Sequence, residues 1–151
     1  MPSDFARIDE LMFAGALPGE RGGGASWREL EQLGVSVLFS LVPRPIAGQP
    51  GNLLREVHQL VDSAGESGAS LDFLTRVVER PESLRQARRV VYVHCVSGVS
   101  RTGLVLVAWR MKQARVGRDA ALEWLRARRP TLAPNPAFMT LLTKWEKSLR
   151  L

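Results

Sequence analysis

This chain of 151 residues contains, at positions 90–103, the stretch Val90-Val91-Tyr92-Val93-His94-Cys95-Val96-Ser97-Gly98-Val99-Ser100-Arg101-Thr102-Gly103. Its first part, residues 90–94, predicts a buried β-strand that ends at the chain's only cysteine, Cys95. Just after Arg101, the apolar run from Leu104 to Met111 predicts a long helix. The sequence therefore predicts a thiol, a loop of five residues and an arginine placed between a strand and a helix.

Such an arrangement is suited to binding a phosphate ester. A short loop that curls into a helix N-terminus points several backbone N–H groups inward, and those donors favour an anion. Gly98 permits the tight curl, because glycine adopts positive φ without a Cβ penalty. Arg101 adds a planar fork that can hold two phosphate oxygens at once. We expect a phosphate-binding loop (P-loop) made of Val96, Ser97, Gly98, Val99, Ser100 and Arg101.

The same donors act on the sulfur of Cys95. Helix N-termini and neighbouring cations lower cysteine pKa values to about 3.5–7.5. The sequence therefore predicts that Cys95 is an ionised nucleophile at neutral pH. The alternative is that Cys95 is a small buried apolar residue at a strand end, as most lone cysteines are. The complete string from His94 to Thr102 favours the nucleophile.

This string closely resembles the signature of the cysteine-dependent protein tyrosine phosphatases, and best matches their small dual-specificity branch. The resemblance implies a two-step reaction in which Cys95 attacks phosphorus and water then hydrolyses the phosphocysteine. It also implies that Arg101 and the loop amides bind the phosphate and its transition state. Thr102 matches the position whose hydroxyl stabilises the leaving thiolate, and His94 matches the residue that supports the loop.

The resemblance further implies a general acid about thirty residues upstream of the cysteine. Three acids lie in that region, Asp62, Glu66 and Asp72. Asp62 ends a strand-like run, residues 57–61, and precedes a flexible segment, so it can swing over a pocket. We therefore predict Asp62 as the acid, with Glu66 as the alternative, whereas Asp72 is expected in the first turn of a helix. Asn135 sits in a pattern similar to the one that orients the hydrolytic water in the family, although an N-cap role explains it equally well.

The order of the elements predicts an α/β fold with a central, mostly parallel sheet flanked by helices and a helical C-terminal half. We expect one phosphatase-like domain over residues 1–151. Ser26 and Glu29 form a capping box, and residues 35–41 are predicted to be a buried strand. An edge strand is expected over residues 10–17, and a helix from Leu71 that Pro81 interrupts. The last helix is predicted to start at Asn135-Pro136.

Composition narrows the possible cofactors and locations. One cysteine and two histidines provide too few soft ligands for a zinc site, so neither a metal nor another cofactor is expected. The chain shows no signal peptide and no apolar run of membrane-spanning length, and we expect a cytoplasmic protein without membrane contact. Its net charge of +6 comes from 18 Arg and 3 Lys against 15 acids. The arginines that follow the central helix, such as Arg126, Arg128 and Arg129, are expected on a basic surface.

The expected substrate is a phosphorylated protein or peptide, with phosphotyrosine first and phosphoserine or phosphothreonine second. The loop positions other than Arg101 carry no charge, which disfavours inositol phospholipids. Two alternatives remain open: a phosphatase of RNA 5′ ends or another small phosphate ester, and a phosphate-binding module without turnover. A nucleic-acid-binding role is not expected, because no basic motif is interleaved with aromatic residues. The oligomeric state cannot be read from the sequence.

Overall fold

A computed structural model of the chain describes residues 2–63 and 69–151. Its sheet follows the spatial order β1-β2-β5-β3-β4. The strands pair in parallel except for β1, which runs antiparallel to β2. The predicted mostly parallel sheet is therefore confirmed. The strands span Phe5–Asp9 (β1), Met12–Gly15 (β2), Val37–Ser40 (β3), Leu54–Val57 (β4) and Val91–His94 (β5).

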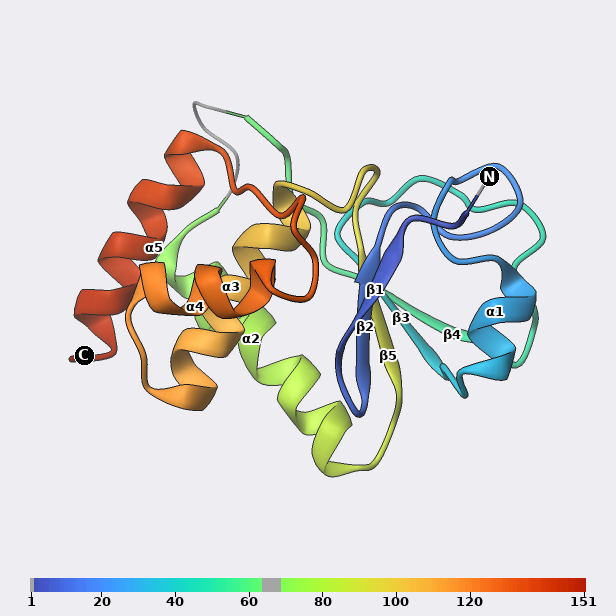
Figure 1. Cartoon of the computed structure of the whole chain (residues 1–151), viewed down its shortest axis with the longest axis horizontal. Coiled ribbons are helices and arrows are strands. Elements are labelled where there is room, and N and C mark those ends of the chain that lie inside the picture. Colours follow the sequence, from blue (N-terminus) through green and yellow to red (C-terminus); the bar gives the residue numbers. More distant parts are fainter. Residues whose placement is uncertain (1, 64–68) are drawn as a thin grey trace.

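Helices cover both faces of this sheet (Figure 1). A short helix, α1, lies on one side, and a group of four helices, α2 to α5, lies on the other. The flanking helices and the helical C-terminal half are thus as the sequence predicted. The helices span Trp27–Gln32 (α1), Leu71–Gln86 (α2), Arg101–Ala114 (α3), Arg118–Arg126 (α4) and Pro136–Ser148 (α5).

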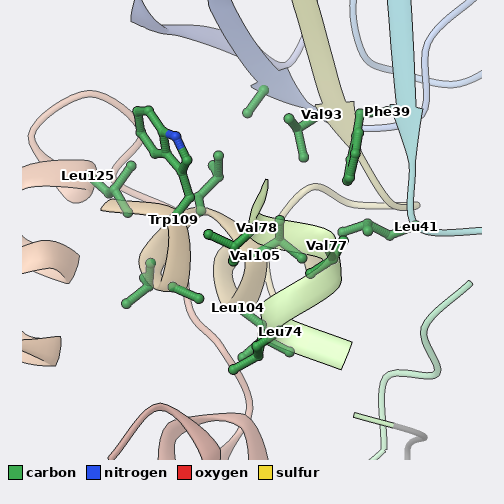
Figure 2. Packing of buried hydrophobic residues seen from close by; sticks show 14 of the residues in the cluster. Phe39, Leu41, Leu74, Val77, Val78, Val93, Leu104, Val105, Trp109 and Leu125 are labelled. Atoms are coloured by element: carbon green, nitrogen blue, oxygen red, sulfur yellow. The ribbon is translucent and has the colours of Figure 1, made fainter. Parts of the chain in front are cut away.

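Side chains of the central strands alternate between two hydrophobic clusters, as the period of two in a strand requires. In β3, Val37 and Phe39 point into the larger cluster, which the four-helix side completes, while Leu38 joins the smaller one beneath α1. Figure 2 shows Phe39 and Val93 above Leu74 and Val78 of α2. A slip by one residue would exchange the side chains of the two clusters, which differ in size and shape, so close packing on both faces fixes the register.

The register aligns the carboxyl ends of the parallel strands. Gly15 pairs with His94, and His94 pairs with Ser40 on its other side. The loop that follows β5 therefore leaves the sheet next to the ends of two neighbouring strands. In Figure 1 this loop, in yellow, lies between the sheet and the four-helix side.

The N-terminal strand was predicted incorrectly. The expected edge strand over residues 10–17 is instead a turn at residues 10 and 11 followed by β2, which lies inside the sheet between β1 and β5. The Asp9 carboxylate accepts the Leu11 N–H at 2.9 Å and so stabilises the turn. The edge strand is β1, whose mixed polar sequence gave no signal.

Two further boundaries differ from the sequence-based expectation. Helix α2 continues through Pro81 to Gln86, because Pro81 is buried on the same face as Leu74 and Val77, and this packing offsets the lost hydrogen bond. The strand expected at residues 57–61 lies earlier, at Leu54–Val57. Beyond it the chain stays tied to the end of β3, since the Leu60 N–H donates to the Leu41 carbonyl. In the described part of the chain, no helix has the length and apolar character needed to cross a membrane.

Candidate active site

Cys95 lies at the base of the loop between β5 and α3 and is 1% exposed. Its Sγ accepts hydrogen bonds from the Gly98 N–H at 3.3 Å and from the Thr102 hydroxyl at 3.1 Å. Hydrogen bonds to the charged form of a group favour that form. The Gly98 N–H and the Thr102 hydroxyl therefore both reach the sulfur, and such donors would stabilise a thiolate intermediate or leaving group.

The loop carbonyls are all bound from outside the loop. Each peptide group is planar and trans, so the carbonyl of one residue and the N–H of the next point in opposite directions. The outward carbonyls therefore turn the N–H groups of residues 96–101 away from the surrounding donors, and this makes an anion-binding concavity. The donor–acceptor pairs are His94 Nδ1 to Cys95 O, Leu17 N to Val96 O, Arg129 Nη2 to Ser97 O, Arg129 Nε to Gly98 O, Ala133 N to Val99 O and Leu104 N to Ser100 O.

Gly98 sits where the loop touches the sheet. Its φ is +71°, and a Cβ built there would lie 2.3 Å from the backbone carbon and oxygen of Gly15, the last residue of β2. Both the backbone angle and the lack of space demand glycine. The curl predicted from the sequence is thus set by close contact with a strand that is remote in sequence.

Arg101 is the first residue of α3, and its guanidinium is only partly bound. One Nη donates to the Leu60 carbonyl at a long 3.4 Å. Its Nε is buried and has no hydrogen-bond partner among the described residues. A buried donor without a partner is costly, and a tetrahedral oxyanion in the loop would supply the acceptors that the fork lacks.

His94 is completely buried and takes part in a hydrogen-bond chain. Its Nδ1 faces the Cys95 carbonyl at 2.9 Å, and because a carbonyl can only accept, Nδ1 carries a proton. In the neutral imidazole Nε2 then accepts the Ser40 hydroxyl proton at 2.6 Å, while Ser40 Oγ accepts from Arg55 Nε at 2.9 Å. Burial above all, and then the charge of Arg55, lower the pKa of His94 to about 4, against the opposing effect of the Cys95 carbonyl.

Asp62 lies at the rim of the loop. Its Oδ1 accepts the Ser100 hydroxyl at 2.8 Å and the Asn135 amide Nδ2 at 2.8 Å. The backbone N–H of Asn135 in turn donates to Ser100 Oγ at 2.9 Å. Asn135 is also the N-cap of α5, since its Oδ1 accepts the Phe138 N–H. The N-cap interpretation of Asn135 is therefore confirmed, whereas its role toward the hydrolytic water stays a prediction.

The other two acids considered for this role are placed differently. Asp72 lies in the first turn of α2, behind the N-cap Ser70, as the sequence predicted. Glu66 falls in residues 64–68, outside the described part of the chain. Within the described ranges, no cluster of three His, Cys, Asp or Glu side chains could hold a metal ion.

Several residues of the site were missed from the sequence. Ser40 and Arg55 carried no signal, because only the pairing of β3 with β4 and β5 brings them to His94. Arg129 was expected on a basic surface, but it is 3% exposed and binds the loop. A guanidinium can be buried in this way because carbonyls and a carboxylate satisfy its donors.

The chain is similar to known proteins in sequence and in fold. Residues 29–148 match the family model of the dual specificity phosphatase catalytic domain. The chain belongs to the dual-specificity phosphatase family. The resemblance seen in residues 94–103 is therefore confirmed, and so is the phosphatase-like fold.

Two curated relatives and one solved structure show the extent of the similarity. Human dual specificity protein phosphatase 16 is 31% identical over 80 residues, which cover 53% of this chain and 12% of that protein. Human dual specificity protein phosphatase 1 is 28% identical over 125 residues, which cover 80% of this chain and 32% of that protein. The crystal structure of human DUSP28 superposes with a TM-score of 0.83 at 22% identity and covers 100% of this chain and 98% of its own. The chain thus spans about a third or less of the length of these two curated relatives.

The contact of Gly98 with β2 leads to a test by paired substitutions. Gly98→Ala and Gly34→Ala both place a side chain at positive φ, but a Cβ at Gly34 meets nothing within 4 Å. Gly34→Ala should lower the free energy of unfolding by about 1–2 kcal/mol. Gly98→Ala should cost a further ~1–3 kcal/mol, because the added carbon overlaps the Gly15 backbone. Urea unfolding measures both, and equal losses would contradict the close approach.

The neutral, buried His94 predicts a specific pH dependence of stability. Its pKa rises from about 4 in the folded chain to 6.5 when unfolded, so the unfolded chain binds more protons between these values. The contribution to stability is complete above pH 6.5 and is lost as the pH falls toward 4, by about 3 kcal/mol. The difference in unfolding free energy between wild type and His94→Asn should therefore shrink over this range.

Leu74→Ala serves as the control for this pH series. Leu74 is completely buried in the larger cluster, so its truncation should cost about 2–5 kcal/mol at every pH. Urea unfolding at pH 7.5, 6.5, 5.5 and 4.5 compares the three proteins. A His94→Asn difference as constant as that of Leu74→Ala would show that His94 does not titrate as its burial requires.

Proposed function

We propose that this chain hydrolyses phosphotyrosine in proteins or peptides, and phosphoserine or phosphothreonine as a second class, through a phosphocysteine intermediate. The observation that carries this proposal is the Cys95 sulfur at the base of a loop whose carbonyls, from Cys95 to Ser100, all point outward. The inward N–H groups and the Arg101 fork supply donors for a tetrahedral oxyanion directly above a nucleophile. Membership of the dual-specificity phosphatase family supports the same reaction.

The proposed first step transfers the phosphoryl group to sulfur. Cys95 Sγ attacks phosphorus, the bond from phosphorus to the ester oxygen breaks, and that oxygen takes a proton from Asp62. In the second step water attacks phosphorus, the S–P bond breaks, and the Asp62 carboxylate accepts the proton of the water. The Thr102 hydroxyl, which donates to Sγ at 3.1 Å, stabilises the thiolate as it leaves.

The position of Asp62 supports its role as the acid. It is hydrogen-bonded to Ser100, the residue directly before Arg101, and so lies at the loop rim where a leaving oxygen would face outward. Asn135 binds the same Asp62 oxygen and orients the carboxyl group. A general acid must lie within hydrogen-bond reach of the leaving oxygen, directly or through one water.

The surroundings of the loop favour a protein substrate. A cleft of about 600 Å³ adjoins the site, since Leu17 lines it and also donates its N–H to the Val96 carbonyl. Apolar side chains such as Trp27 and Ile46 line the cleft together with Arg21 and Arg44. Such a mixed surface can contact the residues that flank a phosphorylated side chain, whereas a small phosphate ester would leave it empty.

Turnover of an aryl phosphate in a metal-free buffer with chelator tests the enzyme directly. Cys95→Ser should abolish hydrolysis of 4-nitrophenyl phosphate, because the alcohol is not ionised at neutral pH. Arg101→Lys should reduce kcat/KM by roughly 100-fold or more, because an ammonium cannot replace the bidentate fork. Arg150→Lys, an exchange at the C-terminal end of the chain, is the matched control. Turnover retained in Cys95→Ser would exclude the proposed mechanism.

The acid assignment is tested with two leaving groups. Asp62→Asn should slow the hydrolysis of phenyl phosphate by a larger factor than that of 4-nitrophenyl phosphate, because nitrophenolate leaves without needing a proton. Kinetics of both substrates for Asp62→Asn, Glu66→Gln and Asp72→Asn provide the measurement. If Glu66→Gln alone showed the leaving-group dependence, Glu66 would be the acid in place of Asp62.

A further inference from the structure

The buried polar side chains of the described residues gather in one place. They are Ser40, His94, Thr102 and Arg129. The first three belong to the hydrogen bonds around Cys95 that are described above. Arg129 is the only one among them that carries a full charge, and charged residues are almost never fully buried unless they are paired.

Arg129 lies in the segment between α4 and α5, and its guanidinium grips the phosphate-binding loop. Its Nε donates to the Gly98 carbonyl at 2.9 Å, and one Nη donates to the Ser97 carbonyl at 3.1 Å. These are two consecutive peptide groups at the turn of the loop. A lysine has a single point of attachment and could not hold both in a fixed geometry.

The two peptide groups carry the donors that matter for catalysis. The Ser97 carbonyl and the Gly98 N–H belong to one planar unit, and the Gly98 N–H donates to Cys95 Sγ at 3.3 Å. The Gly98 carbonyl likewise shares its peptide plane with the Val99 N–H. By binding both carbonyls from outside, Arg129 turns both N–H groups away from itself and toward the anion side of the loop.

Asp4 satisfies the remaining donors of the same guanidinium. Its carboxylate accepts from Nη1 at 2.8 Å and from Nη2 at 3.3 Å. Asp4 is itself held by its backbone, since its N–H donates to the Gly23 carbonyl and its own carbonyl accepts the Ala16 N–H. The pair is open to solvent on the Asp4 side, where the carboxyl side chain is 56% exposed.

We propose that Arg129 is a positioning residue for phosphoryl transfer, which fixes the peptide groups of Ser97 and Gly98 in the anion-binding orientation and is itself anchored by Asp4. This inference rests on the proposed phosphatase function. It adds a residue that acts through the loop backbone, without contact between Arg129 and the substrate.

Tungstate binding and steady-state kinetics of the full chain test the proposal. Tungstate is a tetrahedral oxyanion, so its affinity reports the loop geometry without any turnover. Arg129→Lys should lower kcat/KM and tungstate affinity on the order of 100-fold. Arg115→Lys is the matched control, because Arg115 is the C-cap of α3, at the end of the helix opposite to the loop, and donates to the Leu149 carbonyl. It should stay within about twofold of wild type.

Two results would overturn the proposal. A purely structural role for Arg129 would lower the melting temperature of Arg129→Lys but leave the tungstate affinity and kcat per folded molecule unchanged. If Arg129→Lys does not fold, the tungstate affinity of Asp4→Asn provides the test, because this substitution alters only the exposed end of the Arg129–Asp4 pair. This affinity should fall roughly fivefold. An unchanged affinity would contradict the anchoring of the loop by this pair.

The same experiment separates this inference from the proposed function. If the wild type shows no turnover but binds tungstate more tightly than Arg129→Lys does, the proposed phosphatase reaction is wrong and the positioning role of Arg129 is supported. If the wild type turns over substrate but both proteins bind tungstate equally, the phosphatase reaction stands and the positioning role is wrong.

Discussion

A peptide group cannot turn its N–H toward an anion without turning its carbonyl the other way. The inward direction of the loop N–H groups therefore depends on partners for the carbonyls from Cys95 to Ser100, and these partners come from four directions. They are the His94 ring, the backbone after β2, the Arg129 side chain with the backbone of residue 133, and the first turn of α3. An unbound buried carbonyl would cost about 1–3 kcal/mol. The rest of the fold can thus be described as the frame that brings these donors to one short loop.

The parallel sheet performs this task through its register. Because Gly15, His94 and Ser40 lie at the same level, the chain after β2 meets the loop, and Ser40 meets the ring of His94. Gly98 is packed so closely on Gly15 that no side chain fits. A buried network of this kind is stable only when every member is satisfied. Arg55 completes it by donating to Ser40, so a residue of β4 is coupled through His94 to the peptide group of Cys95.

Arg101 and Arg129 lie on opposite sides of the loop, and their guanidinium groups differ in their hydrogen-bond partners. On the inner side, the Arg101 Nε is a buried donor without a partner among the described residues. On the outer side, the donors of Arg129 are taken by two carbonyls and a carboxylate. Asp62 is placed at the rim by Ser100 and Asn135. The two arginines therefore differ in how far the described residues satisfy their donors: Arg129 is bound to the loop backbone and to Asp4, whereas Arg101 keeps a donor without a partner.

The sequence by itself determined the features that are formed by residues close together in the chain. Cys95, Gly98 and Thr102 lie within eight positions, so strand, loop and helix suffice to bring the Gly98 N–H and the Thr102 hydroxyl to one sulfur. Local signals also predicted the capping box of Ser26 and the start of α5 at Asn135. Only the tertiary structure decided that Pro81 remains inside a helix, that β2 is interior, and that Arg129 is buried. The physical reason is that burial of a proline or a charge depends on partners from distant segments, and no local pattern in the chain records where those partners lie.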